Sequence, residues 1–188
     1  TLRSEPIKGT APRAKDPTQD LALAKALHNN PKERAENIMI VDLVRNDLSQ
    51  IAQKNSVNVE ELCEIYSFET VHQMISKISC ELKPNIGLAH ILKASFPMGS
   101  MTGAPKIAAL QQIEAHEDFK RGLYSGSIGL IEPNGDFDFN VVIRSLLYNR
   151  QKSYVSCAVG SAITIGANAE DEYQECLLKA NKLIHGLR

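Results

Sequence analysis

The sequence predicts an α+β fold, with antiparallel sheets and helices packed outside them, because helical and β-like segments are segregated along the chain. Residues 16–52 show helical periodicity, whereas residues 57–82 and 123–165 show short β-like runs separated by turns. Helices and strands do not alternate as βαβ units. A doubly wound parallel sheet is therefore not expected.

The first quarter of the chain is expected to hold a strand end, a loop and two helices. Residues 1–15 mix prolines and a glycine with charged residues, which is typical of irregular backbone. A helix is expected to begin at Asp16-Pro17-Thr18 and to end at Asn29-Asn30-Pro31. A second helix is expected over residues 31–52, with Pro31 in its first turn.

The middle of the chain is expected to form two strands and two further helices. Residues 57–68 and 71–82 are candidate strands. Residues 85–95 read as a short helix that ends before Pro97. A loop of small residues, PMGSMTGAPK, then leads into a helix over residues 106–118.

The last third is expected to be a β-meander followed by one helix. Strands are predicted over residues 123–132, 137–149 and 154–166, with a tight turn at Asn134-Gly135 and another at residues 151–153. A helix over residues 168–187 is expected to begin at the N-cap Asn168, because acidic residues fill its first turn.

Composition is that of a soluble globular domain. The chain has 188 residues, 43% hydrophobic and 23% charged, with a net charge of −1, so neither a polyanion nor a membrane surface is an expected partner. One domain is expected. The chain opens without Met on a polar stretch, so it is expected to be a piece of a longer polypeptide.

The four cysteines form no CxxC pair, so zinc and redox motifs are unsupported. Scattered single cysteines fit the reducing cytoplasm, and buried thiols are expected. The four are Cys63, Cys80, Cys157 and Cys176.

Two pairs of carboxylates have the same spacing on predicted helices. Glu33 and Glu36 are three residues apart, as are Glu172 and Glu175, so each pair shares one helix face. Two such helices facing each other would offer four carboxylates to a hard cation such as Mg²⁺. Spacing alone equally allows two solvated helix faces.

Two stretches of small residues could approach a ligand closely. GSMTGAPK lacks the order of a nucleotide P-loop, because Pro105 precedes Lys106 and Ile107 follows it. It is either an anion-binding entry to a helix or a plain loop. VGSAITIG, residues 159–166, is either a strand that admits a ligand or a tightly packed strand.

Four single residues are ambiguous from local sequence. Arg144 lies in the predicted apolar strand FNVVIRSLL, where a guanidinium needs a carboxylate partner, from the protein or from a ligand. His72 and Gln73 are expected to be either core residues with satisfied hydrogen bonds or surface residues. Lys8, in PIKGT, is either a solvated charge or a nucleophile that requires desolvation or nearby cations.

Taken together, these segments resemble the chorismate-utilising enzyme family. The resemblance covers nearly the whole chain and follows the family's order of motifs. The motifs are PIKGT, ERAENIMIVDLVRNDL, FPMGSMTGAPKIAALQQIE, YSGSIGLI, VVIRSLL, VGSAITIGA and EDEYQECLLKA. The resemblance implies that residues 1–188 are the C-terminal portion of a chorismate-binding catalytic domain.

The resemblance also implies roles for individual residues. Mg²⁺ would be bound by Glu36 and Glu175, with Glu33 and Glu172 binding through water or supporting those two. A bound dication would offset the crowding of four carboxylates. Arg144 matches the arginine that grips the enolpyruvyl carboxylate of chorismate. Further substrate-binding positions are Gly9, Thr10, Ser100, Thr102, Tyr124, Gly160, Ser161, Ala162 and Lys179.

Within the family, the stretch PIKGT resembles the corresponding stretch of the aminodeoxychorismate synthases. Anthranilate synthases have a stretch similar to PIAGT at this position. In the former, Lys8 would be the catalytic nucleophile that adds to the chorismate ring. GSIG at residues 126–129 also resembles that subfamily. The implied activity is a transferase reaction that aminates chorismate at C4, for para-aminobenzoate and folate synthesis, with ammonia from a glutamine amidotransferase subunit.

Three departures from the family pattern stand out. Gln73 occupies the position where many relatives have a histidine, and His72 would point to the other face of the strand. Ala162 replaces a glycine of the usual GxG. The general acid that relatives carry upstream of PIKGT would precede Thr1. Anthranilate synthase, a non-catalytic fragment and a pure interaction module therefore remain as alternatives.

Overall fold

The computed structural model describes residues 1–186, with the side chain of Lys182 excluded, and confirms the α+β fold. Its strands pair only in antiparallel fashion. The chain divides into two compact units, Thr1–His116 and the part from Glu117 onward, and each is described by itself. The expected single domain over residues 1–188 stays a prediction.

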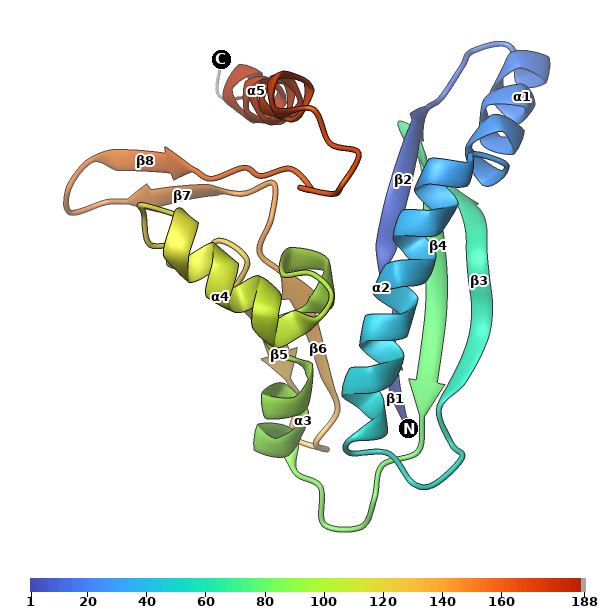
Figure 1. Ribbon diagram of the computed structural model, residues 1–188, viewed down its shortest axis with the longest axis vertical. Coiled ribbons are helices and arrows are strands. Elements are labelled where there is room, and N and C mark those ends of the chain that lie inside the picture. The colour runs from blue at the N-terminus through green and yellow to red at the C-terminus, as the bar shows by residue number, and fades with distance from the viewer. Residues whose placement is uncertain (187–188) are drawn as a thin grey trace. The chain divides into compact units, whose positions relative to one another are not determined.

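Unit 1 is built on strand β4 (Val71–Cys80), which is hydrogen-bonded on both sides (Figure 1). Strand β3 (Asn58–Ser67) lies on one side, and strands β1 (Leu2–Ser4) and β2 (Ile7–Pro12) follow each other along the other side. Helices α1 (Pro17–His28) and α2 (Pro31–Ser49) pack on this sheet. The predicted strand pair 57–68 and 71–82 is therefore confirmed.

Helix starts follow the residue types expected. Asp16 accepts a hydrogen bond from the Gln19 backbone at the start of α1, and Asn30 accepts from Lys32 and Glu33 at the start of α2. Helix α3 is Leu88–Ser95, three residues shorter at its start than predicted, because Gly87 provides the extended N-cap. A 3₁₀ turn, η1 (Gly99–Met101), precedes α4 (Lys106–His116).

The core of unit 1 lies between the helices and alternate residues of β4. Met74 and Ile78 are fully buried on the face that the helices cover. Leu27 of α1 packs with Met74 and Cys63, whereas Val41 and Leu48 of α2 pack with Ile78 in a second cluster. Burial of this kind contributes about 1.5–3 kcal/mol for each large apolar side chain.

Unit 2 contains two hairpins and a helix. Strands β5 (Ser127–Ile131) and β6 (Phe137–Val141) form one two-stranded sheet, and β7 (Leu146–Asn149) and β8 (Tyr154–Cys157) form another. Both predicted turns are present, and Gly135 has the positive φ of +91° that the first requires. Helix α5 is Ala169–His185, and Asn168 caps it as predicted. The predicted helix end at Leu187 lies outside the described residues.

The prediction of a continuous meander in unit 2 is wrong. The predicted strand 137–149 is broken because the Ile143 backbone bonds back to Val141 and Arg144 adopts φ +50°. Strand β8 stops at Cys157 because its partner Leu146 is the first residue of β7. Residues 158–164 are irregular, and the side chain of Ile163 is 83% exposed.

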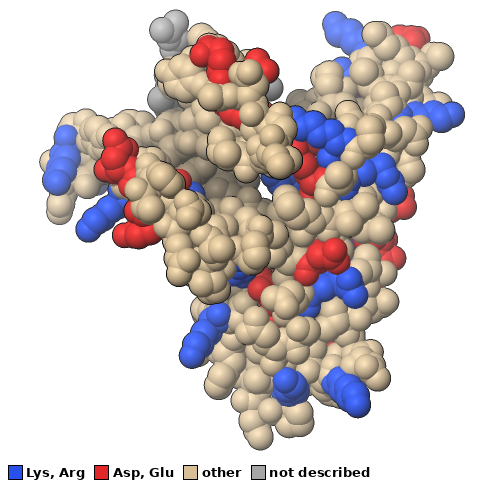
Figure 2. All heavy atoms as spheres, in the orientation of Figure 1, with Lys and Arg blue, Asp and Glu red and all other residues tan. Residues whose placement is uncertain are grey.

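The distribution of surface charge and the burial of the cysteines agree in part with what the sequence predicts. On the face shown in Figure 2, acidic and basic side chains are interspersed within each unit. Cys63 and Cys80 are buried as expected, but Cys157 and Cys176 are only half-buried, and the four thiols are free in the described structure. Among the described residues, no helix has the length and apolar character needed to cross a bilayer.

Candidate active site

Lys8 and Gly9 form a β-bulge in strand β2. Ile7 and Thr10 are paired residues separated by Lys8 and Gly9, whereas their partners on β4 are separated by Met74 alone. Gly9 has φ +90°, a conformation that glycine adopts without strain. Because bulges redirect side chains and interrupt regular pairing, this position suits a functional residue.

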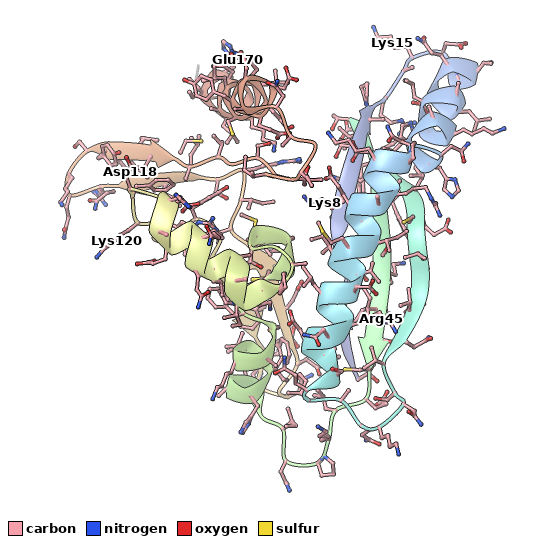
Figure 3. The ribbon with its side chains drawn as sticks, viewed as in Figure 1. Lys8, Lys15, Arg45, Asp118, Lys120 and Glu170 are labelled. Atoms are coloured by element: carbon pink, nitrogen blue, oxygen red, sulfur yellow. The ribbon has the colours of Figure 1, made fainter. Side chains whose placement is uncertain are left out.

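The bulge lies against the first two turns of α2. Lys8 Nζ is 3.8 Å from Glu36 Oε2, and the two side chains are 25% and 21% exposed. A Cβ atom added to Gly9 would lie 3.2 Å from a carboxylate oxygen of Glu33. Figure 3 shows Lys8 on β2 beside this half of α2. The structure therefore brings together Lys8, Gly9, Glu33 and Glu36, hereafter the Lys8 cluster.

A second cluster forms in unit 2 around one face of α5. Glu172, Glu175 and Lys179 are spaced by three and four residues, so they share this face. Ser161 donates a short hydrogen bond to Glu172. Lys179 Nζ donates to the Gly160 carbonyl at 2.9 Å and pairs with Glu175 at 2.6 Å. These contacts fix the irregular segment around Gly160 and Ser161 against α5.

Tyr124 completes this second cluster. A Cβ atom added to Gly160 would lie only 2.6 Å from the Tyr124 hydroxyl, so the close approach requires glycine. Burial raises the pKa of Tyr124, so its hydroxyl stays protonated near neutral pH and can donate a hydrogen bond. We call Tyr124, Gly160, Ser161, Glu172, Glu175 and Lys179 the α5 cluster.

Comparison with known proteins shows the family of this chain. Residues 1–185 match the family of chorismate binding enzymes. The chain belongs to this family. Its resemblance to chorismate-utilising enzymes, inferred from the ordered motifs, is thereby confirmed.

Two curated members of the chorismate-binding family are similar over almost the whole chain. "Aminodeoxychorismate synthase component 1" of Klebsiella aerogenes is 40% identical over 99% of the chain, which spans 41% of that relative. A chloroplastic aminodeoxychorismate synthase of Arabidopsis thaliana is 43% identical over 95% of the chain and is covered over 19% of its length. The chain therefore spans less than half of the length of each of these relatives.

Solved structures of family members share the fold. The menaquinone-specific isochorismate synthase of Escherichia coli superimposes with a TM-score of 0.86 at 26% identity, covering 99% of this chain and 42% of that one. Anthranilate synthase component I of Streptococcus pneumoniae gives a TM-score of 0.82 at 35% identity, covering 96% and 39%.

The two glutamate pairs fit magnesium by their donor chemistry. Each pair presents carboxylate oxygens from adjacent helix turns, and Mg²⁺ is typically held by one or two carboxylates together with waters and substrate oxygens. The pairs belong to different units. Within residues 1–186, no group of three or more His, Cys, Asp or Glu residues is close enough to hold a metal. Magnesium binding therefore stays a prediction.

Arg144 does not lie inside a strand, which corrects the sequence-based interpretation. It occupies the bend between β6 and β7, and it is exposed. The desolvation argument for a carboxylate partner therefore does not apply, because water can solvate the guanidinium. Gly160, Ser161 and Ala162 likewise lie in irregular backbone rather than in a strand.

The loop that carries Ser100 and Thr102 is fastened to α2 at two points. A Cβ atom added to the buried Gly99 would lie 2.9 Å from Leu43 Cβ, so the backbone of the loop packs directly on the helix. Lys106 Nζ, at the start of α4, donates to Asp47 Oδ2 at 2.6 Å. Thr102 Oγ1 donates within the loop, to carbonyls four and three residues earlier.

The Lys106–Asp47 pair is nearly buried, and its loss is expected to destabilise unit 1. Burial raises the pKa of Asp47, while Lys106 opposes that effect. Lys106→Met leaves the buried carboxylate without its counter-charge, so the free energy of unfolding should fall by about 3 kcal/mol. Urea unfolding measures this change. Lys93→Met, on the exposed side of α3, is the control, and equal effects of the two variants would contradict the interpretation.

His72 has a satisfied structural role, as expected for a core histidine. It is 1% exposed, and its Nε2 and Nδ1 atoms lie 3.0 Å from Asp20 Oδ1 and 2.8 Å from Ser67 Oγ. Asp20 also accepts three hydrogen bonds from Arg13, two from Nε and one from Nη2, and one from the Ala14 backbone. This network joins α1, the loop after β2 and the β3–β4 hairpin.

Asp20 is expected to make unit 1 sensitive to acid. The Arg13 guanidinium, the Ala14 N–H and His72 together hold the pKa of Asp20 well below its usual range. An unfolded aspartate titrates near pH 3.9, so stability from Asp20 is present above that pH and is lost as pH falls toward its lower folded pKa. Asp20→Asn should therefore destabilise the protein at pH 7, and this penalty should begin to shrink as the pH falls below about 4.

Urea unfolding of wild type and Asp20→Asn between pH 7 and pH 3 measures this difference. Asp42→Asn serves as the control, because the Asp42 side chain is 64% exposed in a surface pair with Arg45. A constant gap between wild type and Asp20→Asn over the whole range would contradict the assignment.

Sequence reasoning missed three residues that organise unit 1: Asn37, Asp47 and Lys106. Asn37 and Asp47 are both buried on α2. Asn37 stands four residues before Val41, on the apolar face of the helix. The available signal was a polar residue at a position where the helical period predicts an apolar one. Such a residue is buried, so it needs a specific hydrogen-bond partner.

Proposed function

We propose that this chain supplies part of the chorismate site of an aminodeoxychorismate synthase. Such a transferase replaces the 4-hydroxyl of chorismate with an amino group, and the product serves para-aminobenzoate and folate synthesis. The observation that carries the proposal is the position of Lys8, in a β-bulge 3.8 Å from Glu36. Similarity to relatives named aminodeoxychorismate synthase supports it.

In the proposed reaction, Lys8 acts as a covalent nucleophile. Its neutral amine adds to C2 of chorismate, both ring double bonds shift by one position, and the protonated 4-hydroxyl leaves as water. Ammonia then adds at C4, both double bonds shift back, and the Lys8 amine leaves from C2. The lysine is regenerated, and one difficult substitution is divided into two easier ones.

The other residues of both clusters would bind and orient the substrate. Glu36 and Glu175 would hold Mg²⁺ directly, and Glu33 and Glu172 would support them. The metal would supply a positive charge for the ring carboxylate of chorismate. Arg144, being exposed and charged, would reach the enolpyruvyl carboxylate, as a guanidinium can pair with both oxygens of a carboxylate.

Further substrate contacts are proposed for residues around the two clusters. These are Gly9, Thr10, Ser100, Thr102, Tyr124, Gly160, Ser161, Ala162 and Lys179. A glutamine amidotransferase subunit would deliver ammonia. The reducing cytoplasm is the proposed location because the cysteines are scattered singly along the chain and are free in the described structure.

Anthranilate synthase is the second candidate. The solved anthranilate synthase component I of Streptococcus pneumoniae is 35% identical over 96% of this chain, which favours it. The lysine in PIKGT argues against anthranilate synthase, because those enzymes have a stretch similar to PIAGT at this position. Identification of the product formed from chorismate and ammonia distinguishes the two.

Intact mass spectrometry of the full-length protein tests the proposal. Incubation with chorismate and Mg²⁺, without ammonia, should produce an adduct that maps to the peptide containing Lys8. Anthranilate as the product, or an adduct on another residue, would contradict the proposal. A second experiment tests this chain by itself, by calorimetry with chorismate and Mg²⁺. Binding heat from the longer protein but none from this chain would identify the chain as a non-catalytic fragment.

A further inference from the structure

Asn37 is a completely buried polar residue that directly follows Glu36 on α2. Its Nδ2 atom donates to the Met74 carbonyl at 3.3 Å. Its Oδ1 atom accepts from Ser76 Oγ at 2.5 Å and from Cys63 Sγ at 3.7 Å. The side-chain amide therefore uses both its donor and its acceptor end inside the core.

The orientation of this amide is fixed by its neighbours. The Cys63 backbone N–H donates to Ser76 Oγ at 2.9 Å, so the hydroxyl proton of Ser76 is left to donate elsewhere. The Asn37 carbonyl oxygen lies in that direction, which leaves the Asn37 amino group facing the Met74 carbonyl. The Ser76 hydroxyl thus selects one of the two possible orientations of the amide.

Met74 is the residue of β4 that stands opposite the bulge. The pairs on either side join β2 to Ile75 and to Gln73, so Lys8 and Gly9 face Met74 alone. The Asn37 amide consequently connects the helix turn that carries Glu36 with the strand position that faces Lys8. No other side chain in the described part of unit 1 donates a hydrogen bond to the Met74 carbonyl.

We propose that Asn37 is a positioning residue that sets the separation of Lys8 and Glu36. Apolar packing alone would hold α2 on the sheet, but such packing tolerates sliding and rotation of a helix. A buried hydrogen bond with one satisfied orientation specifies a single register, because an unpaired amide or carbonyl in the core is costly. The catalytic consequence rests on the function proposed above.

The first test measures the geometry without using activity. In the full-length protein, competitive acetylation at fixed pH, read by mass spectrometry, gives the reactivity of Lys8 relative to Lys15 and Lys54 as internal standards. Asn37→Ala should change the relative acetylation of Lys8 by about threefold or more, since it displaces the ion pair of Lys8 with Glu36 and a neighbouring carboxylate alters the reactivity of an amine. Val41→Ala is the matched control, because it removes buried contacts of α2 in the other core cluster.

The second test separates positioning from general destabilisation. If the proposed function is correct, Asn37→Ala should lower kcat by about tenfold to a hundredfold with a smaller change in KM, because a misplaced reacting group costs rate. Val41→Ala should change kcat by less than about twofold despite a comparable loss in urea stability. Equal kcat losses in the two variants, or unchanged Lys8 acetylation in Asn37→Ala, would overturn the inference.

Ser76→Ala keeps the test decisive if Asn37→Ala fails to fold. It removes the hydroxyl that orients the Asn37 amide, so it should alter Lys8 acetylation in the same sense but less strongly. Unchanged Lys8 acetylation in a folded Ser76→Ala would then overturn the inference. A wild-type protein that forms no aminodeoxychorismate would contradict the proposed function alone, because the acetylation comparison does not depend on it.

Discussion

Replacing Lys8 with alanine is expected to reduce ammonia-dependent formation of aminodeoxychorismate by about a thousandfold or more, because the proposed covalent route requires its amine. The fold should be retained, since Lys8 lies in a bulge on an edge strand and makes one long ion pair, at 3.8 Å. Steady-state kinetics with ammonia as the nitrogen donor measures the loss. A Lys8→Ala protein that kept full activity would rule out the nucleophile.

Two further variants separate the chemistry of Lys8 from its charge. Lys8→Arg keeps a positive charge beside Glu36 but offers no neutral amine, so it should be as inactive as Lys8→Ala and should form no adduct with chorismate. Lys15→Ala is the matched surface control. Lys15 is exposed in the loop between β2 and α1 (Figure 3), so its loss should leave activity unchanged.

Removal of single carboxylates is expected to weaken magnesium binding in a fixed order. Glu36→Gln and Glu175→Gln should raise the Mg²⁺ concentration needed for half-maximal activity by at least about a hundredfold, because the proposed direct ligands are lost. Glu33→Gln and Glu172→Gln should raise it by about tenfold to a hundredfold, the range for residues that support metal ligands. Calorimetric titration of each variant with Mg²⁺ in the presence of chorismate provides a second measurement.

Matched glutamates outside the clusters provide the controls. Glu69 is exposed in the turn between β3 and β4, and Glu170 is exposed in the first turn of α5, where Figure 3 labels it. Glu69→Gln and Glu170→Gln should leave the magnesium dependence unchanged. Equal effects of all these substitutions would show that net charge, rather than coordination, governs the response.

Local patterns predicted most elements of unit 1. Asp16 and Asn30 mark the starts of α1 and α2, and short β-like runs mark β3 and β4. These signals act over a few neighbouring residues, so a sequence contains them directly. The α+β class follows from the same segregation of helical and β-like patterns.

Local sequence patterns predicted strands in unit 2 that are too long, because a strand ends where its partner strand ends. The apolar residues around Arg144 continue a strand pattern, yet the chain bends there because the Ile143 backbone bonds back to Val141. The small residues around Gly160 also resemble a strand, but they bond to α5 through Lys179 and Ser161 instead. Strand length depends on the partner strand, which a single segment does not specify.

The sequence by itself determined the family, the residue types of both clusters and the helices that carry the glutamate pairs. Only the tertiary structure decided that Lys8 lies in a bulge beside Glu36, that the buried Asn37 bonds to the Met74 carbonyl, and that Lys106 pairs with Asp47. The physical reason is the range of the interactions. Motifs and caps act between near neighbours, whereas bulges, buried amides and ion pairs join residues that only folding brings within reach.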